Sequence, residues 1–189
     1  MKPQFLLLLA SLIFISLTAS ECKKHKSGNP IDQLPAETQT GANTFGCLIN
    51  GQVFLPKGPS LNPILTCYYQ YIYSPSSSGY VFQVAARDNS HPSILNSVNI
   101  LCDSVKLEES KTYTLQEVVR GLSRGNYRHF TDTSLDDFFT YSPFSGELFL
   151  KRFDETNQIA SGTFWFNAVD TNGDTVHVTD GRFDMQFTK

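Results

Sequence analysis

The sequence is short of charge, of tryptophan and of familiar catalytic motifs. Charged residues make up 17% of its 189 residues, and a single tryptophan accompanies 15 phenylalanines and eight tyrosines. No H-E-x-x-H motif or glycine-rich phosphate loop occurs, and none of the four cysteines stands in a C-x-x-C pair. The usual signatures of zinc proteases, nucleotide-binding proteins and dithiol redox proteins are therefore missing. We accordingly assign no catalytic residue, no metal ligand and no cofactor.

One long apolar run is present, and it lies close to the first residue. Phe5 to Leu17 reads FLLLLASLIFISL and follows a single lysine, Lys2. This arrangement is typical of a secretory signal peptide, and the run is shorter than the roughly 20 apolar residues of a membrane-spanning helix. We predict a signal peptide at residues 1–21, and the alternative of a permanent N-terminal anchor stays open.

Cys22 follows the apolar run in the stretch LTASEC. A bacterial lipobox is a short stretch of small residues that ends in a cysteine, whose thiol takes a diacylglycerol. Glu21 departs from that pattern, because a small residue normally precedes the cysteine. Cleavage after Ser20 and secretion of a soluble protein is the alternative. We expect lipidation of Cys22, which would bind the protein to a membrane through its N-terminal lipid.

The next segment predicts a tether, and the remainder predicts one domain. Lys23–Asn43 is polar and contains only two large apolar residues, Ile31 and Leu34, too few to order it independently. We expect residues 22–43 to form a flexible tether and residues 44–189 to form a single β domain. From Ser27 onward 17 acidic residues outnumber 11 basic ones, a net charge of −6. This acidic body argues against a nucleic-acid partner.

The body is patterned for strands. Asn50-Gly51 and Asn172-Gly173 each separate two apolar runs, which predicts two β-hairpins. Further strands are expected at residues 64–73, 79–87, 97–103, 146–153, 163–169, 175–178 and 181–187. The sequence therefore predicts an all-β protein, an antiparallel β-sandwich or alternatively a closed β-barrel, with at most one short helix.

Two segments interrupt this strand pattern. Thr114 and Glu117 are spaced as a helix capping box ahead of Gly121, although the same stretch could be a strand edge. Residues 123–143 alternate irregularly between aromatic and polar types, which we interpret as a long connection or flap. Cys47, Cys67 and Cys102 each lie in an apolar run, and either one disulfide or none could form among them.

Several polar groups are candidate sites. Asp170, Asn172 and Asp174 alternate like the start of a calcium loop, but position 12 is Gly181 rather than glutamate. Asp180, Arg182 and Asp184 would share one face of a strand, where structural ion pairing is the favoured interpretation. The remaining candidates are the flap carboxylates Asp132, Asp136 and Asp137, the scattered His91, His129 and His177, and the cluster Tyr68, Tyr69, Tyr71 and Tyr73. Those tyrosines would split between core packing and a stacking surface for a sugar or peptide.

Two stretches carry a resemblance to a known family. GANTFGCLINGQVFLP and IASGTFWFNAVDTNGDTVHVTDGRFDMQF resemble Bacteroidetes-type lipoproteins of a family of unknown function. The resemblance implies a small β domain behind a lipoprotein signal and brings no catalytic residues. In that group, surface display is associated with acidic residues after the cysteine, and Lys23-Lys24 stand there instead. An outer-membrane lipoprotein facing the periplasm is therefore expected.

Three functions remain open at this stage. The leading hypothesis is a non-catalytic β domain of the cell envelope that binds a protein or glycan partner or serves a structural role. The rival is a periplasmic hydrolase whose carboxylates come from the flap and the last strand. The third is a calcium-stabilised adhesion module. A pocket that holds two carboxylates with shifted pKa values would favour the hydrolase.

Overall fold

The computed structural model describes residues 28–59, 61, 63–73, 78–117 and 121–189. The predicted signal peptide, Cys22 and the basic residues after it lie outside this range. Within the described residues the only helical element is η1, a 3-10 helix at Pro30–Gln33, and all other elements are strands. The prediction of an all-β protein is therefore confirmed. No helix among these residues has the length and hydropathy of a membrane span.

The strands follow one another along the chain and pair mostly as antiparallel neighbours. They are β1 (Thr44–Ile49), β2 (Gln52–Phe54), β3 (Leu65–Ile72), β4 (Gly79–His91), β5 (Ile94–Asp103), β6 (Lys111–Leu115), β7 (Ser123–Thr131), β8 (Leu135–Phe139), β9 (Gly146–Asp154), β10 (Ile159–Val169) and β11 (Thr175–Gln186). Their order in the sheet is β2-β1-β11-β10-β9-β6-β7-β5-β4-β3.

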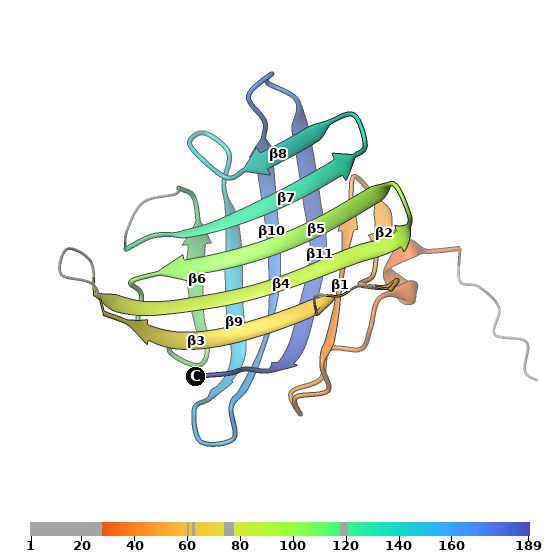
Figure 1. Cartoon of the computed structure of the whole chain (residues 1–189). Coiled ribbons are helices and arrows are strands. Elements are labelled where there is room, and N and C mark those ends of the chain that lie inside the picture. Colours follow the sequence, from red (N-terminus) through yellow and green to blue (C-terminus); the bar gives the residue numbers. More distant parts are fainter. Residues whose placement is uncertain (1–27, 60, 62, 74–77, 118–120) are drawn as a thin grey trace, which may run out of the picture.

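This single sheet folds into two layers. Strands β3, β4, β5, β7 and β8 form one layer and cross steeply over the layer of β1, β2, β6, β9, β10 and β11 (Figure 1). At one side β6 pairs with β7, and β8 pairs with both β7 and β10, so that five strands close into a ring. At the other side Thr188 exchanges backbone hydrogen bonds with Cys67 and Tyr69 of β3. The fold is thus a sandwich of which one part is a closed barrel.

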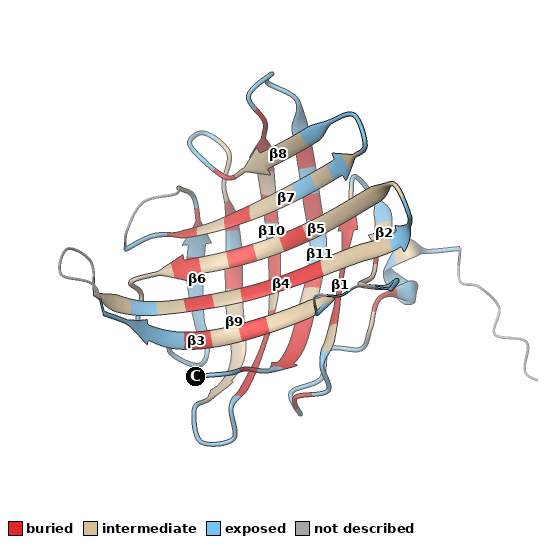
Figure 2. Cartoon of the chain, viewed as in Figure 1, coloured by how far each residue is buried: buried red, intermediate tan, exposed pale blue. Residues whose placement is uncertain are grey.

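The core lies between the layers and follows the period-two pattern of the strands. Buried segments recur along the strands of both layers (Figure 2). Phe82, Phe166 and Phe187 are the largest fully buried side chains. Gly125 makes room for one of them, because a Cβ at this glycine would lie only 2.5 Å from the ring of Phe166. The close approach at Gly125 lets an aromatic ring fill the closed part of the barrel.

The two hairpins predicted from Asn-Gly pairs are confirmed. Asn50 and Gly51 have φ angles of 49° and 78° and join β1 to β2 in a two-residue turn. The second turn is longer, running from Asp170 to Asp174 between the paired ends of β10 and β11. Gly173 takes the left-handed conformation there, with a φ angle of 92°. The first turn uses the tolerance of both asparagine and glycine for positive φ, and the second uses that of glycine.

The segment around Thr114 is a strand and not a helix start. Thr114 pairs with Glu147 across β6 and β9, and Tyr113 and Leu115 alternate with it toward the core. The period-two burial of these two side chains outweighs the local capping pattern. Residues 118–120, which the predicted helix would have included, lie outside the described range.

The prediction of an irregular flap at residues 123–143 is wrong. Strand β7 pairs with β5 along its whole length, and β8 folds back on β7 as a hairpin. The pattern was hidden because the core-facing positions at the start of β7 are Ser123 and Gly125, both buried, rather than large apolar residues. Small residues here fit the close packing against Phe166.

Part of the predicted tether is attached to the domain. Leu34 is buried, and the carboxylate of Asp184 in β11 accepts hydrogen bonds from Thr38, Thr40, Gly41 and Ala42. The ordered contacts therefore begin ahead of the boundary predicted at residue 44. The question of a disulfide is also answered for the described cysteines, because Cys47, Cys67 and Cys102 are all free and buried.

Candidate functional site

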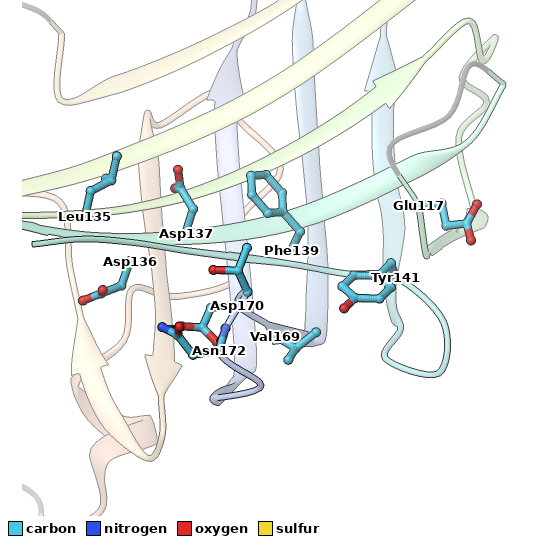
Figure 3. A pocket seen from close by; sticks show the side chains of 10 residues that line it. Glu117, Leu135, Asp136, Asp137, Phe139, Tyr141, Val169, Asp170 and Asn172 are labelled. Carbon is cyan, nitrogen blue, oxygen red and sulfur yellow. Dashed lines mark hydrogen bonds between the residues drawn. The ribbon is translucent and has the colours of Figure 1, made fainter.

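A cavity of about 640 Å³ lies between β8 and the loop that joins β10 to β11 (Figure 3). Three separate parts of the chain line it. Glu117 follows β6, the residues from β8 and just beyond are Leu135, Asp136, Asp137, Phe139 and Tyr141, and the end of β10 and its loop supply Val169, Asp170, Thr171 and Asn172. The volume falls in the range of small-molecule pockets.

Strand pairing fixes the position of this pocket. Phe139 at the end of β8 pairs with Val169 at the end of β10, and β8 is held on its other side by β7. Leu135, Asp137 and Phe139 point to one side of β8, whereas Asp136 points to the other (Figure 3). The lining therefore mixes polar and apolar side chains from both sides of one short strand with those of the turn beside it.

Two of the rim carboxylates have partners within the protein. Asp137 accepts two hydrogen bonds from Arg128, one from Nε to Oδ1 at 2.6 Å and one from Nη2 to Oδ2 at 2.9 Å. This pairing raises the pKa of Arg128. Asp170 accepts hydrogen bonds from the backbone and side-chain nitrogens of Asn172 and from the backbone nitrogen of Asp174. Both carboxylates therefore hold their own segments in place.

The other two rim carboxylates are Asp136, which stands opposite His129 in the β7–β8 pairing, and Glu117; the guanidinium of Arg124 lies 5.8 Å from the centre of the Phe139 ring. Asp136 accepts a long hydrogen bond of 3.4 Å from Ser134, and Glu117 stands toward the opposite end of the cavity (Figure 3). Among the described residues that line the cavity, none is a lysine, arginine or histidine. The lining therefore combines these carboxylates with the apolar side chains of Leu135, Phe139 and Val169. Such a site favours a cation carried on an apolar body.

The loop that was considered as a calcium site is organised by hydrogen bonds to Asp170. Asn172 and Asp174 donate to that carboxylate through their backbone nitrogens, as in an Asx turn. No group of three or more histidine, cysteine, aspartate or glutamate side chains suited to a metal ion occurs in the part of the chain that the structure describes. The loop geometry is thus accounted for by the hairpin.

The predicted ion pairs among Asp180, Arg182 and Asp184 do not form. Asp180 has a φ angle of 53° in a bulge of β11, and Arg182 donates to its backbone carbonyl rather than to its carboxylate. Asp184 binds the segment that precedes β1. The irregular register of β11, which the alternation of the sequence does not reveal, separates the three side chains.

The carboxylates proposed for a hydrolase lie in different places. Asp136 and Asp137 line the pocket at β8, whereas Asp180 lines a smaller cavity at the outer side of β10 and β11. Asp184 is 1% exposed beneath residues 38–42. The flap and the last strand therefore do not bring their carboxylates into one site.

The tyrosine cluster divides as expected between the core and the surface. Tyr69 is buried and stacks on Tyr80 with ring centroids 4.9 Å apart, and Tyr71 meets Tyr80 edge to face while remaining 58% exposed. Tyr73 is exposed, and the hydroxyl of Tyr68 donates to Gln83. These exposed rings stand at the projecting end of β3.

The histidines and Asp132 do not join the pocket. His129 lies 2.7 Å from Asn96, His177 lies 2.6 Å from Asn167, and His91 accepts from the backbone of Ser93. Asp132 is exposed in the turn between β7 and β8. These four side chains therefore lie apart from one another, and none of them lines the pocket.

One motif of the sequence has a structural explanation. Residues 121–125 read GLSRG, a G-x-S-x-G pattern that in hydrolases places a serine on a sharp turn between a strand and a helix. Here Ser123 is buried at the start of β7, and its side chain hydrogen-bonds the thiol of Cys102. The serine therefore lies in the core and not at an exposed elbow.

Sequence reasoning did not identify Glu117, Phe139 or Tyr141 as pocket residues. They come from segments between β6 and β9 whose pairing was not predicted, and Val169 joins them only because β8 bridges to β10. No local pattern in the sequence marks them as neighbours. Two signals in the sequence pointed to this region, the acidic pair Asp136-Asp137 and the candidate calcium loop that contains Asp170 and Asn172.

Comparison with known proteins gives one match. Residues 93–185 match a family model described as Domain of unknown function (DUF6252), a range that runs from the turn before β5 to the end of β11. No curated protein and no solved structure matches the chain significantly. The resemblance to a family of unknown function is supported to that extent, whereas the lipoprotein character and the bacterial group stay predictions.

Proposed function

From the premise of a β domain of unknown function, we propose that the chain is a non-catalytic binding module that is lipidated at Cys22 and tethered to the cell envelope. Its ligand is a cation carried on an apolar body, bound in the pocket between β8 and the β10–β11 loop. The observation that carries the proposal is the composition of this pocket, which combines the carboxylates of Glu117 and Asp136 with the apolar side chains of Leu135, Phe139 and Val169.

Binding rather than catalysis is favoured by how the remaining carboxylates are used. Asp137 is held by Arg128, and Asp170 is held by its own loop, so both maintain the walls of the pocket. Glu117 and Asp136 are then the groups free to attract a ligand. Each can contribute Coulomb attraction to a bound cation, and the acidic body strengthens the same preference at longer range.

The tether follows from the sequence. The apolar run at residues 5–17 and Cys22 behind it support export followed by lipidation. The start of η1 at Pro30 lies eight positions after Cys22, a stretch of chain that reaches at most roughly 30 Å when extended. The proposed lipid would therefore hold the domain close to the membrane surface, with a periplasm-facing outer-membrane position as the favoured location.

The ligand is tested with two probes of the same size and opposite charge. Titration of the purified protein with n-hexylammonium is expected to shift the amide signals of Phe139, Tyr141 and Val169 in a saturable manner, whereas n-hexanoate is not. A Glu117→Gln/Asp136→Asn double variant should weaken n-hexylammonium binding roughly tenfold or more, as expected for the loss of about 1.4 kcal/mol. Asp132→Asn, an exposed change on the same hairpin, serves as the control.

Two results would contradict the proposed ligand. Equal binding of n-hexanoate would show that charge does not select the ligand. Unchanged affinity in the double variant would show that these two carboxylates play no part. Either result leaves the proposed lipid anchor untouched, because the anchor has its own test.

The anchor is tested by metabolic labelling with an alkyne fatty acid. The wild-type protein should carry the label, Cys22→Ala should lose it, and Glu21→Ala should keep it because a small residue restores the usual lipobox. An unlabelled wild-type protein, or a labelled Cys22→Ala variant, would reject lipidation at this cysteine.

A further inference from the structure

A second cavity lies on the opposite layer, around the single tryptophan of the chain. Trp165 in β10 is 40% exposed, although tryptophan is mostly buried in small domains. A cavity of about 280 Å³ opens beside it, lined among others by Glu147, Thr163, Asp180 and Arg182. The volume lies just below the range of pockets for drug-sized molecules, so it suits a ligand of about one ring.

A β-bulge shapes this cavity. Phe164 pairs with Gly181 and Phe166 pairs with Val178, so that Thr179 and Asp180 of β11 both stand opposite Trp165. Asp180 adopts a φ angle of 53°, which is unfavourable for a residue with a Cβ. Bulges of this kind bend a strand and redirect side chains, and they are frequent next to binding sites. Here the bulge places Asp180 at the cavity beside the indole.

Hydrogen bonds fix the groups around the cavity. The indole Nε1 of Trp165 donates to Glu147 at 3.3 Å, which sets the orientation of the ring. The Nε of Arg182 donates to the backbone carbonyl of Asp180 at 3.3 Å, and one of its terminal nitrogens reaches the carbonyl of Pro35 at 3.5 Å. These contacts use two of the five N–H bonds of the guanidinium, and Nη1 also stands 4.0 Å from a carboxylate oxygen of Glu37, which lines the cavity too. Donors therefore remain for a ligand, and the surrounding carboxylates supply acceptors.

The chemistry of these groups selects among ligand classes. A free cation would face Arg182, and a free anion would face Glu147 and Asp180. A wholly apolar ligand would bury these charged groups without partners, which is costly. A neutral ring with one apolar face and several hydroxyl groups satisfies the indole, the donors and the acceptors together.

We propose that the cavity at Trp165 binds a single pyranose ring of a neutral glycan, with the sugar stacked on the indole and its hydroxyl groups bonded to Glu147, Asp180 and Arg182. This site is separate from the pocket at β8, because the two cavities have no lining residue in common and this one is formed by Glu37 and residues of β9, β10 and β11. Its test does not depend on the ligand proposed for that pocket.

The single tryptophan makes the test direct, because all tryptophan fluorescence of the described domain comes from Trp165. The probes are the methyl pyranosides of glucose, galactose, mannose and N-acetylglucosamine, each added to tens of millimolar. At least one should produce a saturable change in emission. Glu147→Gln keeps the fluorophore and should weaken that binding roughly tenfold, since it removes a charge-assisted hydrogen bond. Tyr71→Ala, on the exposed tyrosines of β3, is the matched control and should bind as the wild type does.

Three outcomes would overturn the proposal. The first is that none of the four sugars changes the emission. The second is a saturable response to tetramethylammonium in place of the sugars, which would identify a cation site. The third is sugar binding that survives in Trp165→Ala when measured by calorimetry, which would place the sugar elsewhere. The exposure of Trp165 lets this variant fold, and circular dichroism verifies that it does.

Discussion

Asp184 is the residue on which the segment before β1 depends. Its carboxylate accepts hydrogen bonds from the hydroxyl of Thr38 at 2.6 Å and from the backbone nitrogens of Thr40, Gly41 and Ala42 at 2.7 to 3.2 Å. Burial by itself would raise the pKa of Asp184, but these hydrogen bonds to the charged form together outweigh it and lower the pKa. The hydrogen bonds from residues 38 to 42 therefore stabilise the buried negative charge of Asp184, and the same bonds hold that segment in place.

Replacement of this carboxylate should give a pH-dependent loss of stability. Because the pKa of Asp184 is lower in the folded protein than its unfolded value of about 3.9, its contribution is complete above that value and disappears as the pH falls through the folded pKa. Asp184→Asn should lower the free energy of unfolding by about 2–3 kcal/mol at pH 7, since amide nitrogens would face the donors. Urea unfolding at pH 7 and pH 3 measures the difference, which should narrow at pH 3.

Asp132→Asn provides the control for this experiment, because Asp132 is an exposed carboxylate in the turn between β7 and β8. It should leave the unfolding free energy nearly unchanged at both pH values. A loss in Asp184→Asn that is equally large at pH 3 and pH 7 would show that the charge of Asp184 is not what holds the segment.

At the scale of elements, local signals and long-range contacts were predicted with very different success. The hairpin at Asn50-Gly51 and that at Asn172-Gly173 were both found, because a tight turn is specified by the residues that form it. The β7–β8 hairpin was missed, since Ser123 and Gly125 break the expected apolar alternation. The contact of residues 38–42 with Asp184 spans more than 140 residues of sequence, and no local pattern marks it.

The candidate site was beyond sequence reasoning for the same reason. Its residues come from β8, from the end of β10 and from the segment after β6, which meet only because β8 pairs on both sides. Asp136 and Asp137 were noted as carboxylates, but their neighbours could not be named without that pairing. Trp165 was unremarkable in the sequence, because the bulge opposite it shows only in the register of β10 and β11.

The turn between β1 and β2 gives a prediction that isolates backbone conformation. A Cβ at Gly51 would meet nothing within 4 Å, yet the φ angle of 78° is one that other residues adopt with difficulty. Gly51→Ala should therefore lower the free energy of unfolding by about 1 kcal/mol through backbone strain alone. Gly28→Ala is the matched control, because Gly28 also has open space around it and lacks a positive φ. Equal effects of the two changes in thermal unfolding would contradict this explanation.

At the scale of the whole molecule, both layers share one core that opens only when they separate. Cys47 in β1, Cys67 in β3 and Cys102 in β5 are distributed over the two layers, and all are buried. Burial raises the pKa of each thiol, and that of Cys102 rises to about 12 although Ser123 donates a hydrogen bond that opposes the change. Because the thiolate is the reactive form, these cysteines should be inert in the folded protein.

Thiol labelling can therefore report whether the two layers open as a unit. In a Cys22→Ala variant at pH 8, Cys47, Cys67 and Cys102 should not react with a disulfide reagent under native conditions, and all three should react in concentrated guanidinium. In intermediate denaturant, where unfolding limits the reaction, the three should be modified at one common rate, because exposure of each requires the same global opening. Peptide mapping after timed quenching measures each rate separately.

Cys67 lies in β3 at the end of the strand order, where Thr188 supplies the pairing across its outer side. Modification of Cys67 well ahead of the other two would show that this contact opens independently and that the ring of β6, β7, β8, β10 and β9 is the more stable unit.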